Sequence, residues 1–234
     1  MNIKEFNKEE SPRVGIVAIY YGEPGSGKSF NAFAFPGPML VIDTENRCEL
    51  VLRQQDQDKE VYIAPAKTFK EVVEALNFFH TKTKDMEKSN TILGKGTIVI
   101  DSATMLYQFA QTEYLQTSGA QKIYPQFEWG KVYALLDNLI MKLRDCGHNV
   151  IFTSQVRDEY VEESKTGRRI MDIYKKLPYM SDIIIHCSRD TEKNERKFVV
   201  VKNGYGEEQY YEIEAGLEGL YSTLHITDQK EDED

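Results

Sequence analysis

Residues 22–29 of the chain read GEPGSGKS and fit the pattern G-x-x-x-x-G-K-[ST]. Glycines let the backbone curl so that successive N–H groups point into one concavity, which binds phosphate. The apolar run before this loop, residues 14–20 (VGIVAIY), predicts a buried strand. A helix is expected over residues 28–35, before the breaker PGP at 36–38, and its N-terminus adds partial positive charge. This context favours a nucleotide-phosphate site over a chance glycine turn.

The order of residues within the loop assigns roles to its last two members. Lys28 is predicted to reach the β- and γ-phosphates, and the Ser29 hydroxyl to bind Mg²⁺. ATP and Mg²⁺ are therefore the expected cofactors. The residues expected to bind the nucleotide are Gly22, Glu23, Pro24, Gly25, Ser26, Gly27, Lys28, Ser29 and Phe30.

Two acidic residues follow apolar strands in the sequence. Asp101 ends the run TIVID and is the candidate that supports Mg²⁺, although an aspartate there can also cap the next helix. Glu45 lies just beyond the strand expected at residues 39–42 and could orient the water that attacks the γ-phosphate. A solvated turn or a helix N-cap is the equally weighted alternative for Glu45.

Strands and helices alternate along the rest of the chain. This alternation predicts an α/β fold with a mainly parallel central sheet flanked by helices, and closely spaced strands after residue 182 predict an antiparallel extension at the C-terminal edge. Residues 156–181 are polar and show no pattern. Further strands are expected at 61–64, 97–100, 149–153, 182–187, 196–201 and 210–213, and helices at 68–87 (with Thr68 and Glu71 as a capping box), 102–116 and 130–146.

Length and composition bound the remaining possibilities. The chain has 234 residues and a net charge of −9, which excludes a uniformly basic nucleic-acid coat but not a local basic groove. No apolar run approaches 18 residues and no secretory signal is present, so neither a membrane span nor export is expected. Three scattered cysteines fit a reducing, cytoplasmic setting without disulfides or structural zinc. One domain is expected over 14–227, between a polar leader (1–13) and an acidic tail (228–234).

Five short motifs in register resemble the RecA-like recombinase core ATPases, a family of P-loop NTPases. The resemblance spans about Val14 to Ile213. It implies Glu45 as the base that activates water, Asp101 for Mg²⁺, Gln155 as the γ-phosphate sensor and Lys202 as a lysine that reaches a neighbour's ATP. The motifs are GEPGSGKS (22–29), VIDTE (41–45), VIDSATMLY (99–107), IFTSQV (151–156) and FVVVKN (198–203).

The chain is similar above all to the minimal, phage-encoded RecA-type proteins of single-strand annealing and recombination. The resemblance implies a DNA-stimulated ATPase that acts on single-stranded DNA in recombination or repair and assembles into a filament or ring. A single-strand DNA-binding protein is a further expected partner. Compared with the long recombinases, the chain is expected to lack large flanking domains. It also has Gly204 where bacterial members carry a second lysine.

Two mobile loops bind DNA in that family, and by position they correspond to residues 117–129 and 156–180. The first contains Trp129, for which packing at the start of a helix is favoured over base stacking. The second has nearly balanced charge, and its basic stretch 165–169 reads equally well as a phosphate contact or as a solvated hairpin turn. The candidate DNA-binding residues are Lys122, Tyr124, Arg157, Lys165, Arg168 and Arg169.

Two other functions remain open from the sequence. A nucleotide-switched regulatory or scaffold ATPase without a direct DNA role is favoured by the net charge of −9. A P-loop small-molecule kinase would use the stretch 167–169 as a lid, but Gln155 and the strands after it fit a kinase poorly. The acidic tail is either a solubilising end or a competitor for the DNA groove.

Overall fold

The computed structural model describes residues 15–55, 58–86, 94–123, 128–205, 210–216 and 219. The predicted leader (1–13), the acidic tail (228–234) and the DNA-binding candidate Tyr124 lie outside these described residues. None of the helices formed by the described residues is both long and apolar enough to span a bilayer.

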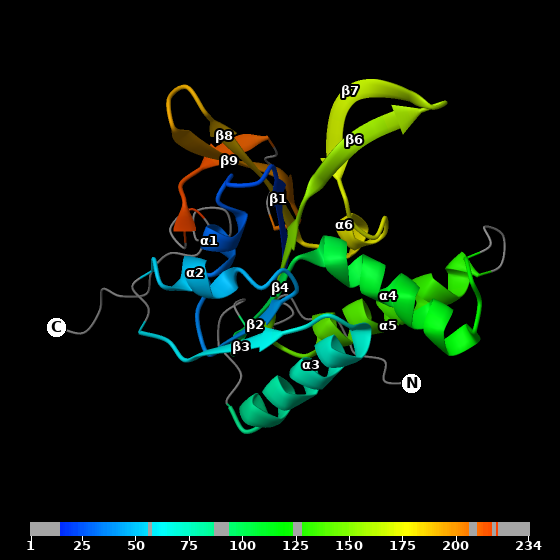
Figure 1. The fold of residues 1–234 in the computed structure, drawn as a ribbon. Coiled ribbons are helices and arrows are strands. Elements are labelled where there is room, and N and C mark those ends of the chain that lie inside the picture. Colours follow the sequence, from blue (N-terminus) through cyan, green and yellow to red (C-terminus); the bar gives the residue numbers. More distant parts are fainter. Residues whose placement is uncertain are drawn as a thin grey trace, which may run out of the picture.

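An eight-stranded sheet forms the centre of the molecule, in the order β10-β9-β8-β1-β5-β4-β2-β3 (Figure 1). The six strands from β8 to β3 pair in parallel, whereas β9 and β10 add to β8 in antiparallel fashion. The expected α/β class with an antiparallel C-terminal edge is therefore confirmed. The strands are β1 (Val17–Gly22), β2 (Met39–Asp43), β3 (Val61–Pro65), β4 (Thr97–Asp101), β5 (Asn149–Ser154), β8 (Ile183–Asp190), β9 (Glu195–Asn203) and β10 (Tyr211–Ile213).

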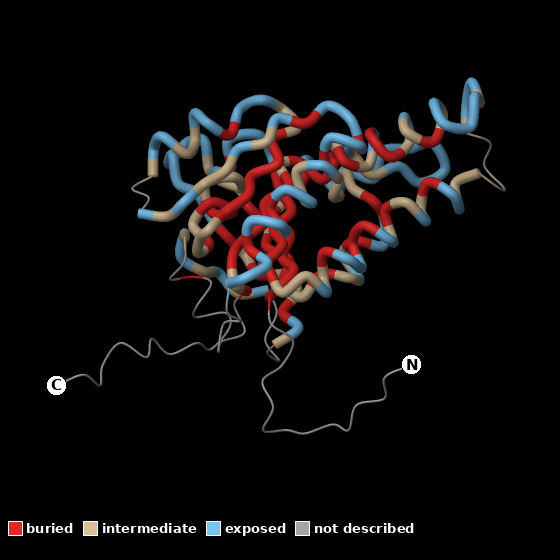
Figure 2. The backbone as a smooth tube through the Cα atoms, turned by 90° about the horizontal axis from the view of Figure 1, so that it is seen from below, coloured by how far each residue is buried: buried red, intermediate tan, exposed pale blue. Residues whose placement is uncertain are grey.

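Helices cover both faces of this sheet, because alternate strand residues point to opposite sides. In β1, Val17 and Ile19 join a core cluster with α3, α4 and α5, while Ala18 and Tyr20 join a second cluster with α1 and α2. The buried residues run through the middle of the chain trace (Figure 2). The helices are α1 (Lys28–Ala32), α2 (Cys48–Leu52), α3 (Phe69–Thr83), α4 (Ala103–Ser118), α5 (Trp129–Asp145) and α6 (Leu177–Met180).

Local sequence signals set the start of α3. The Thr68 hydroxyl accepts a hydrogen bond from the Glu71 N–H at 3.2 Å, and a Glu71 carboxylate oxygen accepts from the Thr68 N–H at 3.0 Å. The predicted capping box is thereby confirmed. The helix ends at Thr83, earlier than the predicted residue 87, whereas the short helix α2 was not predicted at all.

Residues 156–181 correct the expectation of an unpatterned loop. They form an antiparallel hairpin of β6 (Val156–Val161) and β7 (Ser164–Met171), followed by α6, and the hairpin projects from the body of the molecule (Figure 1). Its turn lies at Glu162 and Glu163, both with positive φ, so the stretch 165–169 belongs to a strand and not to a turn. Most of the hairpin is exposed or half-buried, and therefore its sequence lacks the apolar alternation that marks a strand with one buried face.

The parallel arrangement determines where the polar strand ends meet. Strands β1, β2, β4 and β5 are neighbours in parallel register, so their carboxyl ends lie at one edge of the sheet. The loop 22–29, the stretch 43–45, Asp101 and Gln155 all follow or end these strands. This edge is where open α/β sheets bind ligands.

Candidate functional site

The loop 22–29 runs from β1 into α1 and depends on its glycines. Gly25 and Gly27 have φ values of 76° and 94°, in the left-handed region that favours glycine. A Cβ at Gly22 would lie 1.9 Å from the Cys187 carbonyl oxygen of β8. The sequence GEPGSGKS therefore closes tightly against the neighbouring strand, as the phosphate-loop interpretation requires.

Lys28 is turned back onto the loop. Its Nζ donates to the Gly22 carbonyl at 2.9 Å and to the Glu23 carbonyl at 2.8 Å. Burial lowers the pKa of Lys28, although nearby carboxylates, including those of Asp101 and Glu45, favour its charged form. The ammonium group therefore lies within the loop that the phosphates of a nucleotide would enter.

Ser29 and Asp101, which are far apart in the sequence, are in direct contact at the predicted site. The Ser29 hydroxyl donates to Asp101 Oδ2 at 2.6 Å across 72 residues of sequence. The Thr153 hydroxyl, at the end of β5, donates to Asp101 Oδ1, and Cys48 Sγ lies 3.4 Å from Oδ2. These contacts hold the carboxylate at the carboxyl edge, between β2 and β5.

The donor set at this point fits Mg²⁺. A hydroxyl and a carboxylate are hard oxygen donors, and Mg²⁺ in nucleotide sites uses one or two carboxylates together with phosphate oxygens and water. Ser26 Oγ is buried in the same loop and has no hydrogen-bond partner in the described part of the chain. Within the described ranges, no group of three or more His, Cys, Asp or Glu side chains could hold a metal ion.

Glu45 and Gln155 meet at the same edge. Gln155 Nε2 donates to Glu45 Oε1 at 2.8 Å, and the Ser102 hydroxyl donates to the same oxygen at 2.9 Å. The Gln155 backbone N–H donates to the Thr104 hydroxyl at 3.2 Å. Gln155, which follows β5, and Ser102, which follows β4, therefore orient the Glu45 carboxylate.

Asp43 has a supporting part in this arrangement. Its buried carboxylate accepts from the Cys48 N–H at 2.8 Å and from the Glu45 N–H at 3.2 Å. These two bonds hold the turn between β2 and α2, which places Glu45. Asp43 thus stabilises this turn, and Glu45 contacts Gln155. The role of Glu45 in activating water stays a prediction.

Lys202 lies away from its own chain's loop. It pairs with Ile184 near the amino end of β8, whereas Gly22 pairs with Cys187, which lies further along that strand. Its Nζ donates to the Pro178 carbonyl at 2.8 Å and to the Ser181 carbonyl at 2.5 Å, and burial lowers its pKa. Contact with a neighbour's nucleotide stays a prediction.

The basic candidates of the second predicted DNA loop lie on or beside the β6–β7 hairpin. Arg157 lies 3.4 Å from Asp172, Lys165 lies 2.7 Å from Asp158, and Arg169 reaches Glu23 of the phosphate loop at 3.1 Å. Arg168 is exposed. Sequence reasoning missed Tyr160, a residue that is 54% exposed and whose ring centroid lies 5.9 Å from the Lys165 ammonium. An aromatic residue inside a charged run was the available signal.

The first predicted loop is described only in part. Lys122 follows α4, and Trp129 begins α5, where its ring centroid lies 5.8 Å from that of Tyr133 and 6.4 Å from that of Tyr107. Trp129 thus packs at the start of α5, as the packing interpretation expects, and is half-buried there.

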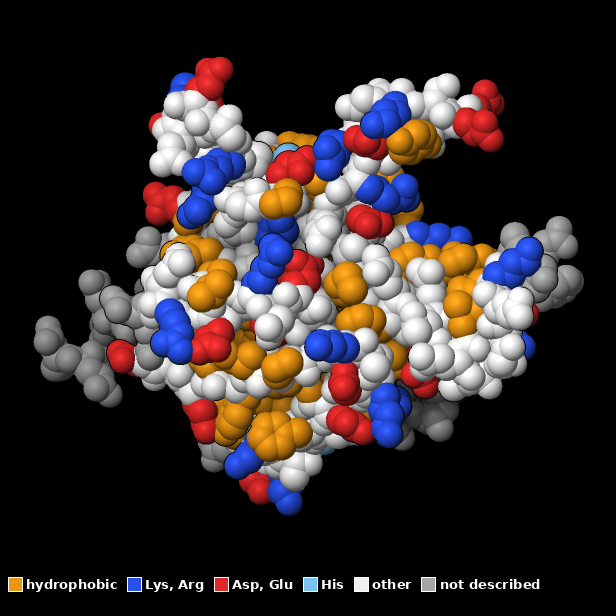
Figure 3. Space-filling view, in the orientation of Figure 1, with side chains coloured by type: hydrophobic (Ala, Val, Ile, Leu, Met, Phe, Trp, Pro, Cys, Tyr) orange, Lys and Arg blue, Asp and Glu red, His pale blue; other side chains and the backbone are white. Residues whose placement is uncertain are grey.

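A cavity of about 670 Å³ adjoins the phosphate loop at Gly27 and Phe30. Two arginines that sequence reasoning missed, Arg189 and Arg196, line it from the β8–β9 hairpin, and Phe198 forms part of its wall. Lys and Arg side chains are visible on both projecting hairpins and on the surface between them (Figure 3). No charge pattern in the sequence marked these arginines, because tertiary pairing of β8 with β1 brings them to the loop.

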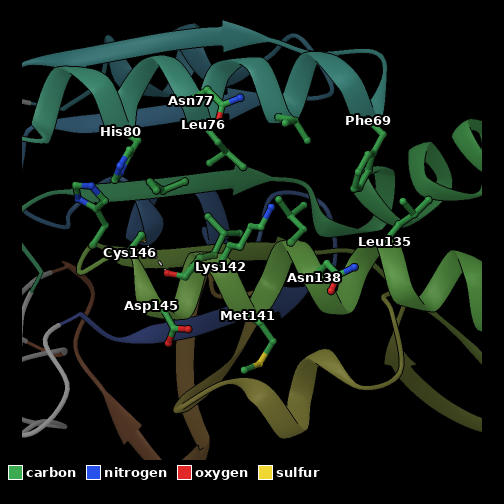
Figure 4. A pocket seen from close by; sticks show the side chains of 15 residues that line it. Phe69, Leu76, Asn77, His80, Leu135, Asn138, Met141, Lys142, Asp145 and Cys146 are labelled. Atoms are coloured by element: carbon green, nitrogen blue, oxygen red, sulfur yellow. Dashed lines mark hydrogen bonds between the residues drawn. The ribbon is translucent and has the colours of Figure 1, made fainter. Parts of the chain in front are cut away.

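A second cavity, of about 780 Å³, lies between α3 and α5. Figure 4 shows Leu76, Leu135 and Met141 among its lining, with His80 and Cys146 toward one end. None of the predicted site residues lines it, so it is separate from the candidate nucleotide site.

The strand–loop–helix geometry, the Ser29–Asp101 contact and the parallel sheet together define a P-loop nucleotide-binding domain. Residues 15–212 match the model of a family described as an AAA domain, and because this match covers most of the chain, the chain belongs to that family. It is therefore a nucleotide-binding ATPase domain. A comparison with curated proteins finds no match.

Proposed function

We propose that the chain is a RecA-like, Mg²⁺-dependent ATPase that acts on single-stranded DNA in recombination or annealing. One observation carries the proposal. Gln155, the residue directly before the β6–β7 hairpin, is hydrogen-bonded to Glu45 at the ATP edge. A group that faces the γ-phosphate is thereby linked to a projecting element that carries exposed cations and an exposed aromatic ring.

In the proposed reaction, ATP is the substrate, and each residue at the carboxyl edge of the sheet has a separate role. Lys28 exchanges its carbonyl partners for the β- and γ-phosphates, and the loop N–H groups hold the phosphate chain. Glu45 orients a water molecule and accepts its proton as the water oxygen attacks the γ-phosphorus and the bond to ADP breaks. Mg²⁺, held by Ser29 and supported by Asp101, would neutralise phosphate charge.

The nucleoside part of ATP is assigned to the cavity beside the loop. This cavity continues from Gly27 and Phe30 and offers an aromatic wall at Phe198 and cationic side chains at Arg189 and Arg196. The lining thus combines aromatic surface with charged side chains of both signs, since Glu212 and Glu214 also belong to it.

The proposed DNA-binding surface is the β6–β7 hairpin. Tyr160 and Lys165 combine a ring that can stack on a base with a cation that can contact phosphate, as single-strand binding proteins do. Arg168 adds a second exposed cation. Lys122 and Tyr124, together with assembly through Lys202 into a filament or ring, remain predictions from the sequence.

The test is the ATPase rate of the full chain with and without single-stranded DNA, combined with DNA binding measured by fluorescence anisotropy. We expect clear stimulation, and loss of stimulation when Gln155→Ala breaks the link to Glu45. An unchanged rate together with no DNA binding would contradict the DNA role and favour the regulatory ATPase. Phosphate transfer to a nucleoside would instead favour the kinase.

A further inference from the structure

The β6–β7 hairpin contacts the phosphate loop through one side chain. Arg169 Nη2 lies 3.1 Å from Glu23 Oε1 and 3.4 Å from Oε2, across 146 residues of sequence. The same guanidinium keeps contacts on its own hairpin, to the Val156 carbonyl at 3.3 Å and to Asp158 at 3.6 Å. Arg169 therefore spans from the hairpin to the second residue of the loop.

Two cations converge on that loop residue. The Glu23 carboxylate binds Arg169, while the Glu23 carbonyl accepts a hydrogen bond from Lys28 at 2.8 Å. Lys28 is the residue assigned to the β- and γ-phosphates. Arg169 therefore contacts the same loop residue as the lysine that is assigned to these phosphates.

Arg169 and Lys165 share one partner on the hairpin. Lys165 lies 2.7 Å and Arg169 3.6 Å from the Asp158 carboxylate, and Arg169 reaches on to Glu23 of the phosphate loop. The pairing of β6 with β7 shifts register between Asp158 and Tyr160, opposite the segment that holds Arg168. Among the ion pairs that the basic stretch 165–169 forms with described residues, the pair of Arg169 with Glu23 therefore links the hairpin to the phosphate loop.

We propose that Arg169 is a γ-phosphate-binding residue that the hairpin supplies to the phosphate loop of its own chain. When ATP binds, the guanidinium exchanges the Glu23 carboxylate for phosphate oxygens. The exchange is feasible because an ion pair between half-exposed side chains (48% and 51% exposed) is weak, whereas guanidinium binds phosphate in a bidentate, charge-assisted way.

This exchange couples the hairpin to the nucleotide at two points, Arg169 on β7 and Gln155 before β6. ADP lacks the γ-phosphate and leaves Arg169 on Glu23. The inference rests on the ATP site of the proposed function and not on its DNA role.

The test is equilibrium binding, by the full chain with Mg²⁺ and without DNA, of ADP and of the non-hydrolysable analogue β,γ-imido-ATP. Arg169→Ala is expected to weaken binding of the analogue by about 10-fold to 100-fold, as for loss of a charge-assisted contact, and to leave ADP affinity within about 2-fold. Arg169→Lys should reduce affinity for the analogue less than Arg169→Ala does. Arg53→Ala is the matched control, since Arg53 forms a similar exposed pair with Glu49 on α2.

Equal loss for both nucleotides, or no loss for either, would overturn the proposal. A second variant, Glu23→Gln, removes the competing carboxylate and is expected to raise affinity for the analogue relative to ADP; a fall to the level of Arg169→Ala would count against it. A wild-type chain that binds both nucleotides but ignores DNA would contradict the DNA role alone.

Discussion

The carboxyl edge of the sheet and the β6–β7 hairpin hold their charged groups in opposite ways. At the edge, Asp101 receives hydrogen bonds from Ser29, in the first turn of α1, and from Thr153 of the buried strand β5. On the hairpin, Lys165 and Asp158 form a pair whose side chains are 62% and 37% exposed. Electrostatic interactions strengthen where water is excluded and weaken where it is not. The edge is therefore built to hold fixed geometry, and the hairpin to exchange partners.

The strongest test of the edge is Lys28→Ala. The variant loses the cation that binds the β- and γ-phosphates, and we expect ATP turnover to fall by about 10³-fold or more. Because the side-chain hydrogen bonds of Lys28 to described residues go to two carbonyls of the loop, the fold should persist. A phosphate-release assay and circular dichroism measure both; retained turnover would break the assignment of the loop.

Glu45→Gln separates binding from hydrolysis at the same edge. The amide keeps the shape of the side chain but cannot accept the proton from water, so hydrolysis should fall by about 10²-fold or more. Binding of ATP should persist. Isothermal calorimetry with ATP and a steady-state assay test this, and full activity would remove Glu45 from the mechanism.

Substitutions in the two regions should also differ in how much they lower the free energy of unfolding. Phe152 of β5 is fully buried, and Phe152→Ala is expected to cost about 3 kcal/mol or more because it leaves a cavity in the core. Tyr160 of the hairpin is 54% exposed, and Tyr160→Ala should cost about 1 kcal/mol or less. Urea unfolding measures both; similar costs would contradict the division between a rigid core and an exposed hairpin.

The dependence of stability on pH should come from His148, a buried residue just before β5, and not from the β6–β7 hairpin. His148 is buried beside Phe79, with its Nε2 3.0 Å from the Thr83 hydroxyl, and burial lowers its pKa from 6.5 to about 4. The unfolded chain takes up a proton near pH 6.5 and the folded chain only near pH 4. Stability is thus fully present above pH 6.5 and falls toward pH 4, by about 3 kcal/mol at most.

His148→Gln is the control for this pH dependence. Its melting temperature should change less between pH 6.5 and pH 4 than that of the wild type. The pair of Lys165 with Asp158 lowers the pKa of that carboxyl, but both side chains are exposed and the contribution is screened by solvent. An unaltered profile in His148→Gln would assign the pH dependence elsewhere.

The smallest expected effect on function is on DNA affinity. Replacing Lys165 and Arg168 together by alanine should weaken binding of single-stranded DNA by about 10-fold and make it less dependent on salt, as expected when phosphate contacts are lost. Anisotropy titrations at several salt concentrations measure this. An unchanged salt dependence would place the DNA-binding surface away from the hairpin.

Much of the fold was predictable because its signals are local. The loop GEPGSGKS, the apolar strands of the parallel sheet and the Thr68–Glu71 capping box each lie within a few consecutive residues. Asp101 and Glu45 could be identified as candidates because each follows an apolar strand. The hairpin β6–β7 could not, since strands with little buried surface have no reason to alternate apolar with polar residues.

The sequence alone determined the class of the protein, because a phosphate loop needs a particular order of residues between a strand and a helix. Only the tertiary structure decided which distant groups meet: Ser29 with Asp101, Glu45 with Gln155 and Glu23 with Arg169 lie 72, 110 and 146 residues apart. Such contacts follow from strand order and register, which bring together strand ends and hairpins that no local pattern connects.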